Sequence, residues 1–389
     1  MEQKKKKFLT KKKLLAGVVV VAVAAGGFLF FRSGGETAAP VNVVAVEQQT
    51  LRDSVSLKAP LEGTETVEIV SNLHYEVTAI NVKEGDRVTK GQVLAVLDTD
   101  AMEQLRKDGY EVVEQFYEPD QLGAALKEFD AVVVRSKTKV RAAQIDEAKG
   151  SQLKLIIRGG VGVDNIDVDY AKAAGIDVKN TPRASSESVA ELAMAHMFSC
   201  ARYISHAGYT MRNGQWEKKA YGKGIELQGK TLGIVGFGRI GQHLGVMAKA
   251  IGMKVVAFDV YQVPVISELL KIPYVTMDEL LAESDFISVH APAVDGGALI
   301  SRENISKMKD GVVVINTSRG TNVDEEALLE ALNSGKVRAA GLDVYADEPA
   351  TNKALYSHPM VSCTPHIGAA TVEAQKRIGQ EIVEIIKEM

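Results

Sequence analysis

The sequence contains little cysteine and little tryptophan, and it carries no large excess of charge of either sign. Its two cysteines, Cys200 and Cys363, stand far apart, which excludes a disulfide framework and provides no metal-ligand spacing. The formal net charge of −4 argues against nucleic acid as the main partner. The only tryptophan, Trp216, lies in a polar segment, where we expect it to anchor packing and to take no part in catalysis. The sequence therefore predicts neither a metal site nor a nucleic-acid interface.

Long hydrophobic runs are rare, and the exception lies at the N-terminus. Seven lysines within residues 1–13 precede an uncharged apolar run, Leu14 to Phe31. At about 1.5 Å per residue a helix over this run nearly spans a hydrocarbon core of about 30 Å. The lysines predict a cytoplasmic N-terminus and an exported body, so residues 1–35 are predicted to be a membrane anchor. A cleaved signal peptide is the alternative, because Ala22-Val23-Ala24 offers a small-residue site.

Residues 40–99 have a different character and are predicted to form short strands separated by turns. Within them, Val77 to Val82 is one such strand. The stretch from Ala79 to Asp98 resembles the lipoyl-type half-motif of membrane-fusion (adaptor) subunits of efflux pumps. Adaptors continue into a helical hairpin and a second half-motif, and neither pattern follows here. The resemblance implies a partial β segment, and it leaves an adaptor carrying an inactive enzyme as a rival function.

From Ala101 onward, helix and strand patterns alternate, which is typical of parallel sheets with helices on both faces. We predict two doubly wound α/β domains. The first is flavodoxin-like and covers 92–187, completed by 365–389. The second is a Rossmann domain covering 188–364.

Two strands of the first domain are predicted on weaker grounds. Glu111 to Gln115 has a strand pattern. No apolar strand that belongs to the domain itself precedes Ala101. We predict that Val93 to Leu97 fills this place, because it is apolar enough to be buried on both faces as a parallel strand requires.

A glycine-rich turn follows the buried-strand pattern Leu232 to Val235. Gly236, Gly238 and Gly241 form Gly-x-Gly-x-x-Gly. In such a turn the first glycine allows the tight bend, the second lets a pyrophosphate approach the backbone, and the third lets helix and strand pack closely. The strand before the turn and the helical pattern after it predict a dinucleotide-binding site.

The residues around this turn specify the dinucleotide further. Arg239 and Ile240 open the helix whose N-terminus would face the pyrophosphate. Asp259 ends the next strand 18 residues beyond Gly241. This is close to the spacing of about 20 residues at which an acid accepts hydrogen bonds from both ribose hydroxyls. A carboxylate there also repels a 2′-phosphate. The pattern therefore predicts NAD and not NADP.

Three later strand patterns end in polar residues. Ligands bind beyond the carboxyl ends of the strands in open α/β sheets, so these residues are predicted to converge on the nicotinamide. In chain order they are Thr317 and Arg319, then Asp343 with Glu348 just beyond it, and finally His366. We expect Thr317 and Asp343 to contact the cofactor.

These motifs together resemble the D-isomer-specific 2-hydroxyacid dehydrogenases over about residues 101–389. The resemblance assigns Arg319 in Asn-x-x-Arg-Gly as the clamp on the substrate carboxylate. It assigns Glu348 before proline as the partner of His366, the acid/base in Thr-Pro-His-x-Gly. The chemistry needs these residue types, because a neutral imidazole can take the hydroxyl proton and a planar guanidinium can hold a carboxylate with paired hydrogen bonds.

The resemblance also implies a substrate-binding set in the first domain. It consists of Arg135, Ser136, Arg158, Gly159 and Gly160. Either arginine could instead be an ordinary surface cation. Arg158 fits the cationic position associated with phosphorylated substrates.

Within this family the motifs most closely resemble the enzymes that oxidise 3-phosphoglycerate to 3-phosphohydroxypyruvate in serine biosynthesis, and the resemblance implies that reaction. We therefore expect a small-molecule 2-hydroxy acid substrate, NAD and a homodimer formed through the nucleotide-binding domain. A hydroxypyruvate or glyoxylate reductase and a D-lactate dehydrogenase remain alternatives. The dehydrogenase part of the chain resembles cytoplasmic enzymes. A cytoplasmic location of this part conflicts with the export that the expected membrane anchor over 14–31 implies.

Overall fold

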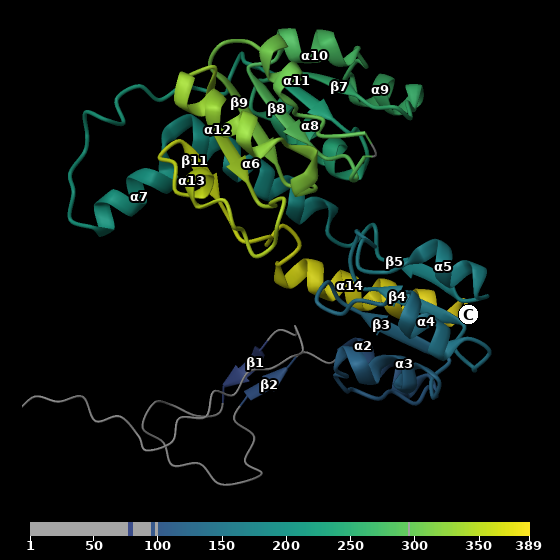
Figure 1. Cartoon of the computed structure of the whole chain (residues 1–389). Coiled ribbons are helices and arrows are strands. Elements are labelled where there is room, and N and C mark those ends of the chain that lie inside the picture. The colour runs from purple at the N-terminus through teal and green to yellow at the C-terminus, as the bar shows by residue number, and fades with distance from the viewer. Residues whose placement is uncertain (1–76, 81–94, 98–99, 295) are drawn as a thin grey trace, which may run out of the picture. The chain divides into compact units, whose positions relative to one another are not determined.

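The computed structural model describes residues 77–80, 95–97, 100–294 and 296–389, all within one compact unit, 70–389 (Figure 1). The predicted anchor over 14–31 and most of the adaptor-like segment over 40–99 lie outside these residues. None of the helices in the described ranges is both long and apolar enough to cross a membrane.

The larger sheet has six parallel strands in the order β11-β10-β9-β8-β6-β7 (Figure 1). The four inner strands β6, β8, β9 and β10 are mostly apolar and buried on both faces, as a parallel sheet between helices requires, whereas the edge strands β7 and β11 each contain an exposed residue. The strands are β6 (Thr231–Val235), β7 (Lys254–Phe258), β8 (Phe286–Val289), β9 (Val312–Asn316), β10 (Val337–Leu342) and β11 (Val361–Cys363).

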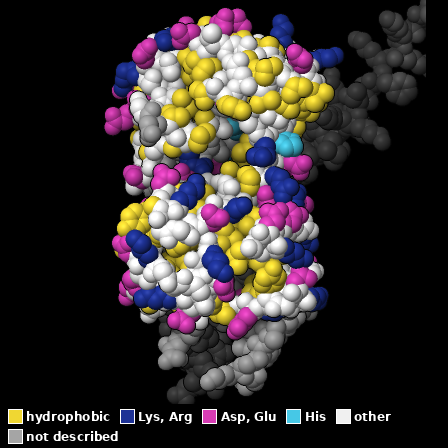
Figure 2. Space-filling view, turned by 90° about the vertical axis from the view of Figure 1, so that its right-hand side faces the viewer, with side chains coloured by type: hydrophobic (Ala, Val, Ile, Leu, Met, Phe, Trp, Pro, Cys, Tyr) yellow, Lys and Arg dark blue, Asp and Glu magenta, His cyan; other side chains and the backbone are white. Residues whose placement is uncertain are grey.

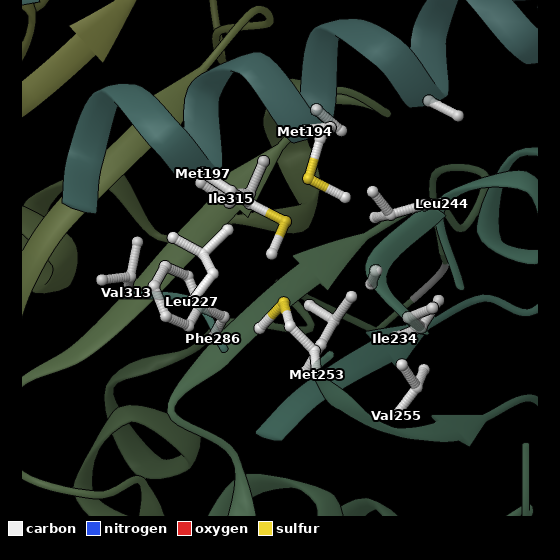
Figure 3. Packing of buried hydrophobic residues seen from close by; sticks show 14 of the residues in the cluster. Met194, Met197, Leu227, Ile234, Leu244, Met253, Val255, Phe286, Val313 and Ile315 are labelled. Carbon is white, nitrogen blue, oxygen red and sulfur yellow. The ribbon is translucent and has the colours of Figure 1, made fainter. Parts of the chain in front are cut away.

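Helices cover both faces of this sheet, and two hydrophobic clusters result. One cluster joins the sheet to α6 (Ser186–Arg202) and α8 (Arg239–Ala250), and Figure 3 shows Met194, Met197 and Leu244 pointing into it. The second cluster joins the other face to α10 (Met277–Glu283), α11 (Arg302–Lys307) and α12 (Glu325–Ser334). The doubly wound prediction is confirmed for this domain. Its remaining helices are α7 (Ile204–Arg212), α9 (Pro264–Leu270), η1 (Gly320–Asn322) and α13 (Lys353–Tyr356).

The smaller sheet has three parallel strands in the order β3-β4-β5. They are β3 (Ala131–Val134), β4 (Leu155–Arg158) and β5 (Asp177–Asn180). A separate hydrophobic cluster packs their helices against them, including Leu126, Ile145 and Ala171. The helices of this part are α2 (Asp100–Lys107), α3 (Pro119–Leu126), α4 (Ala142–Ala148), α5 (Val168–Ala173) and, from the C-terminus, α14 (Val372–Lys387).

Two strand predictions for this part are wrong. Residues 111–115 form no strand, and the guanidinium of Arg106 binds there instead, to the carbonyl of Val112 and the carboxylate of Glu114. The borrowed strand is not in the sheet either: β2 (Ala95–Leu97) pairs antiparallel with β1 (Val77–Ile80). None of the described strands pairs with residues 111–115 or with β2 in this sheet. Among the described strands β3 therefore lies at an edge, and its Val133 is 43% exposed.

The surface of the larger domain is uneven in character. Figure 2 shows one face of the whole chain, where Lys and Arg side chains lie among Asp and Glu side chains and apolar groups. Large apolar side chains are exposed along α7 and the segment after it, and Trp216 is 78% exposed. The expectation that Trp216 anchors packing is therefore wrong for the single chain.

Candidate active site

The turn after β6 has the backbone that its glycines predict. Gly236 has φ of +91°, and a methyl group there would lie 2.7 Å from the backbone nitrogen of Ala291. A methyl group on Gly241 would lie 2.5 Å from the carbonyl oxygen of Gly236, so this glycine permits close contact of helix and strand. Around Gly238 the corresponding space is open. That open space before α8 is where an approaching pyrophosphate needs room.

Asp259 follows β7 and lies beside this turn. One carboxylate oxygen accepts a hydrogen bond from the N–H of Phe237 at 2.7 Å, and the other from the N–H of Tyr261 at 2.8 Å. These bonds fix the carboxylate next to the glycine turn. Arg239 is exposed and Ile240 half-buried at the start of α8. The residues predicted for NAD from the glycine motif therefore lie around one helix N-terminus.

Among the buried polar atoms that lack a partner in the described residues, two belong to the residues that directly follow β9 and β8, where a nicotinamide nucleotide is expected to bind. They are the hydroxyl of Thr317 and Nδ1 of His290. The other ring nitrogen of His290 contacts the hydroxyl of Ser288 at 2.8 Å. Burial lowers the pKa of His290 to about 3, so its ring is neutral and is not an acid. An unsatisfied buried polar atom is costly, which makes these atoms suitable for ligand contacts.

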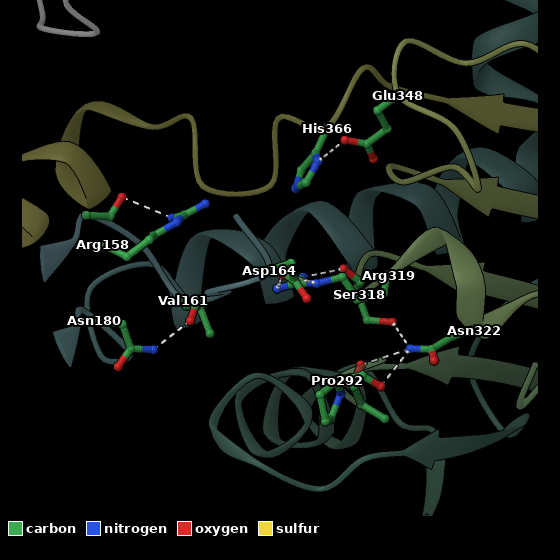
Figure 4. A network of polar contacts seen from close by, with 12 residues as sticks. Arg158, Val161, Asp164, Asn180, Pro292, Ser318, Arg319, Asn322, Glu348 and His366 are labelled. Atoms are coloured by element: carbon green, nitrogen blue, oxygen red, sulfur yellow. Dashed lines mark hydrogen bonds and ion pairs between the residues drawn. The ribbon is translucent and has the colours of Figure 1, made fainter. Parts of the chain in front are cut away.

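His366 and Glu348 form a pair, as predicted. Nδ1 of His366 lies 2.7 Å from Oε2 of Glu348, and both side chains are half-exposed (Figure 4). Because a carboxylate only accepts, Nδ1 carries the hydrogen and Nε2 of a neutral ring has a free electron pair. His366 itself has φ of +54°, a left-handed backbone that is uncommon for a side chain of this type. The pair has the arrangement that general acid/base chemistry needs.

Arg319 is held by a tight polar turn after β9. The side chain of Asn316 donates to the carbonyl of Arg319 at 2.8 Å and accepts from the N–H and hydroxyl of Ser318. Asn322 ties the same turn to the carbonyls of Ala291 and Pro292 (Figure 4). Arg319 is thus carried on a backbone that is hydrogen-bonded to the segment after β8 as well as to its own turn after β9.

The guanidinium of Arg319 binds a carboxylate of the chain itself. Its Nε and Nη2 each lie 2.9 Å from Oδ2 of Asp164 (Figure 4). Burial raises the pKa of Asp164, but the charge and hydrogen bonds of Arg319 outweigh it and the net pKa is lowered. Sequence reasoning missed Asp164, although it lies in the glycine-rich loop over residues 159–165, which directly follows β4.

Three arginines pass over three glycines of that loop. A methyl group on Gly159 would lie 3.2 Å from Cδ of Arg135, and one on Gly160 would lie 1.3 Å from Nη1 of Arg158. At Gly162 it would lie 1.7 Å from Nη2 of Arg319. The glycines therefore create the space that the guanidinium groups occupy. Gly160 also has φ of +144°, where a side chain would strain the backbone.

The positive charges of Arg135, Arg158 and Arg319 affect one another. Burial lowers the pKa of Arg158 to about 10, and the charges of Arg135 and Arg319 add to the effect. Arg158 donates to the carbonyl of Gly159, and Arg135 donates to the side chain of Gln375 in α14. Ser136 is exposed after β3. The predicted substrate residues thus include a concentration of positive charge, which favours an anionic ligand.

Asp343 ends β10 and is almost completely buried. One of its carboxylate oxygens accepts from the hydroxyl of Thr364 and the N–H of Ile367, and the other accepts from the N–H of Gly368. Asp343 therefore holds the loop that carries His366. This structural task was not predicted.

Comparison with known proteins agrees with this geometry. The model of the D-isomer-specific 2-hydroxyacid dehydrogenase NAD-binding domain matches residues 194–368. The hydroxypyruvate reductase of Thermotoga maritima is 52% identical over 300 residues, which are 75% of this chain and 96% of that protein. The chain belongs to the D-isomer-specific 2-hydroxyacid dehydrogenase family. NAD is accordingly the cofactor of the glycine turn.

Two further relatives show the breadth of the family. The D-3-phosphoglycerate dehydrogenase of Mycobacterium bovis is 44% identical over 69% of this chain, and the chain spans half the length of that relative. The structure of D-lactate dehydrogenase from Aquifex aeolicus, complexed with NAD and lactic acid, has a TM-score of 0.62 and 35% identity over 68% of this chain and 84% of its own. These comparisons give no support to the adaptor resemblance of residues 1–99.

Proposed function

We propose that this dehydrogenase interconverts 3-phosphoglycerate and 3-phosphohydroxypyruvate with NAD. The observation that carries the proposal is the convergence of Arg135, Arg158 and Arg319 on one glycine loop. A simple 2-hydroxy acid has one carboxylate, for which one guanidinium suffices. A phosphorylated substrate adds about two further negative charges, which two further arginines match.

The site residues have defined tasks in this reaction. Arg319 holds the substrate carboxylate, and His366 takes the hydroxyl proton on Nε2 while Glu348 keeps Nδ1–H oriented. Bound NAD supplies the acceptor for the hydride that leaves the carbinol carbon. Thr317 and Asp343, which follow the ends of β9 and β10, are the residues that we propose to contact the nicotinamide. In the reverse direction the protonated His366 gives its Nε2 proton to the carbonyl oxygen of the keto acid, which becomes the hydroxyl.

Reduction of unphosphorylated hydroxypyruvate is the second candidate, because the 52% identical relative is a hydroxypyruvate reductase. The two candidate reactions differ in one respect: a phosphorylated substrate needs Arg135 and Arg158 to bind its phosphate, whereas hydroxypyruvate does not. Arg135→Ala and Arg158→Ala should each lower kcat/KM for phosphohydroxypyruvate by about 10- to 100-fold, the loss expected for a charged hydrogen bond of roughly 1.5–3 kcal/mol. For hydroxypyruvate the change should be small.

The experiment follows NADH absorbance with both substrates. Lys154→Ala is a matched control, since it removes an exposed positive charge before β4 that pairs only weakly with Asp130 at 3.9 Å. Equal losses on both substrates in the arginine variants would refute the phosphate-binding role. Absence of turnover with any 2-keto acid, in protein that is folded, would refute the proposed function itself.

We further propose that the protein is a homodimer and that the apolar face of α7 forms the contact. Ile204, Tyr209, Met211 and Trp216 are each more than half exposed in the single chain. Exposed apolar groups gathered in this way are typical of interaction surfaces. Trp216→Ala together with Met211→Ser should shift the mass in light scattering from dimer to monomer. A wild-type mass of one chain would contradict the proposal.

For the N-terminal part, we propose that residues 14–31 attach the protein to the membrane and that residues 1–91 contribute nothing to catalysis. The support is the lysine-flanked apolar run in the sequence. Cell fractionation should find the full chain with the membranes. Activity measured in detergent should equal that of a chain beginning at Gln92. A chain found entirely in the soluble fraction would refute the attachment.

A further inference from the structure

His196 is a buried histidine of α6 that the assignments above leave without a task. It is 2% exposed, and both ring nitrogens are hydrogen-bonded: Nδ1 to the hydroxyl of Ser362 and Nε2 to that of Thr364, each at 3.0 Å. Gly341 makes room for it, since a methyl group there would lie 2.6 Å from Cβ of His196. Burial lowers the pKa of His196, although Asp343 acts in the opposite direction. The ring is therefore neutral.

The hydrogens of this network have one consistent arrangement. Asp343 is a carboxylate and can only accept, so the hydroxyl of Thr364, at 2.7 Å, must donate to it. That hydroxyl has no second hydrogen, so Nε2 of His196 must be the donor to Thr364. Nδ1 of the neutral ring then accepts, and the hydroxyl of Ser362 donates to it. The hydrogen bonds thus run in one direction, from β11 through α6 to Asp343.

Asp343, which accepts the last hydrogen bond of this network, also binds the loop that carries His366. Asp343 also accepts from the N–H groups of Ile367 and Gly368, both at 2.8 Å. These two residues directly follow His366, whose φ of +54° must be maintained by its surroundings. A change in the orientation of the Asp343 carboxylate would therefore move the backbone of His366.

We propose that His196 is a positioning residue for the dehydrogenase reaction, which acts through Thr364 and Asp343 on the loop that carries His366. The proposal rests on the proposed function, because it takes His366 as the acid/base. Thr364 donates to Asp343 in only one of its hydroxyl rotamers, and the Nε2–H of His196 selects that rotamer. A residue at 196 without a donor at this position leaves the rotamer unselected.

Three substitutions at position 196 test this. His196→Gln places an amide donor near the position of Nε2, whereas His196→Asn reaches only to the position of Nδ1. His196→Leu removes both groups. Misplacement of a catalytic group by about 1 Å costs about 10²-fold in rate, so Leu and Asn should lower kcat by 10- to 100-fold. Gln should restore kcat to within a few-fold of wild type, and KM for NADH should change little in all three.

A double-mutant cycle shows whether the effect passes through Thr364. Thr364→Val alone should lower kcat like His196→Leu, and adding His196→Leu to it should lower kcat by less than about threefold more, because linked residues are not additive. Met197→Ala is the control for core damage: it is the next residue of α6 and points into the hydrophobic cluster (Figure 3). It should lower stability while leaving kcat intact.

A second measurement does not depend on turnover. The N–H groups of Ile367 and Gly368 should exchange with deuterium faster in His196→Leu, His196→Asn and Thr364→Val, but not in Met197→Ala. If the wild type reduces no 2-keto acid, the proposed function fails and this exchange pattern still decides the role of His196. Full additivity of the two substitutions in kcat, equal rates in Gln and Asn variants, or unchanged exchange would each overturn the proposal.

Discussion

Gly162→Ala should disable the substrate clamp without disturbing the fold. A methyl group at this position would lie 1.7 Å from Nη2 and 2.8 Å from Cζ of Arg319, and 2.7 Å from Oδ2 of Asp164. Ordinary contacts are about 3.5 Å or longer, so the guanidinium has to move by roughly 2 Å. A displacement of about 1 Å already costs about 10²-fold, so kcat/KM should fall by at least that factor.

The same geometry predicts a small change in stability. The backbone of Gly162 does not have positive φ, and the obstructing atoms belong to the end of a flexible side chain. The control is Gly175→Ala, where φ is +78° and nothing lies within 4 Å of the added methyl group. That variant should lose about 1–2 kcal/mol of unfolding free energy and retain its kcat/KM.

The assay is NADH oxidation with phosphohydroxypyruvate, combined with urea unfolding of each variant. Gly162→Ala should change activity with little change in stability, and Gly175→Ala should do the reverse. A kcat/KM within about threefold of wild type for Gly162→Ala would show that Arg319 functions from another position. The assignment of the clamp would then be wrong.

Two further predictions concern the acid/base and the cofactor. His366→Ala should lower turnover by about 10²–10⁴-fold, the usual contribution of a general acid/base, while NADH binding measured by fluorescence stays near wild type; a loss of binding that matches the loss of rate would contradict the role. Asp259→Ala removes two potential acceptors for ribose hydroxyls and one charge that repels a 2′-phosphate, so the ratio of kcat/KM for NAD to that for NADP should fall; an unchanged ratio would show that selectivity resides elsewhere.

The parts of the fold predicted from sequence are those that local pattern determines. The turn at Gly236 was predicted because three closely spaced glycines indicate the backbone conformation and the close contacts of that turn. The ends of β9 and β10 were predicted because apolar runs stop at polar residues there. In each case the residues that determine the structure are neighbours in the sequence, so a local sequence pattern is enough to predict it.

What sequence reasoning missed depends on partners that are distant in the chain. Residues 111–115 have a strand pattern, but whether they pair with a strand depends on tertiary contacts that a local pattern does not record. Asp164 lies far in sequence from Arg319, and His196 lies far from Thr364, so neither contact leaves a periodic signal. His196 in particular occupies an apolar stretch of a helix, where a histidine is ordinarily just part of the packing.

The ion pair between Arg319 and Asp164 affects how substrate affinity should be understood. Because the guanidinium already holds a carboxylate, an arriving substrate exchanges one partner for another and does not neutralise a bare cation. The measured Kd then reports the difference between two similar interactions. Because Asp164 competes for Arg319, we expect weaker binding of both substrate and product. When product leaves, Arg319 can bind Asp164 again. We therefore expect Asp164, whose side chain is 62% exposed, to occupy the guanidinium when no substrate is bound and to lower the affinity for substrate and product.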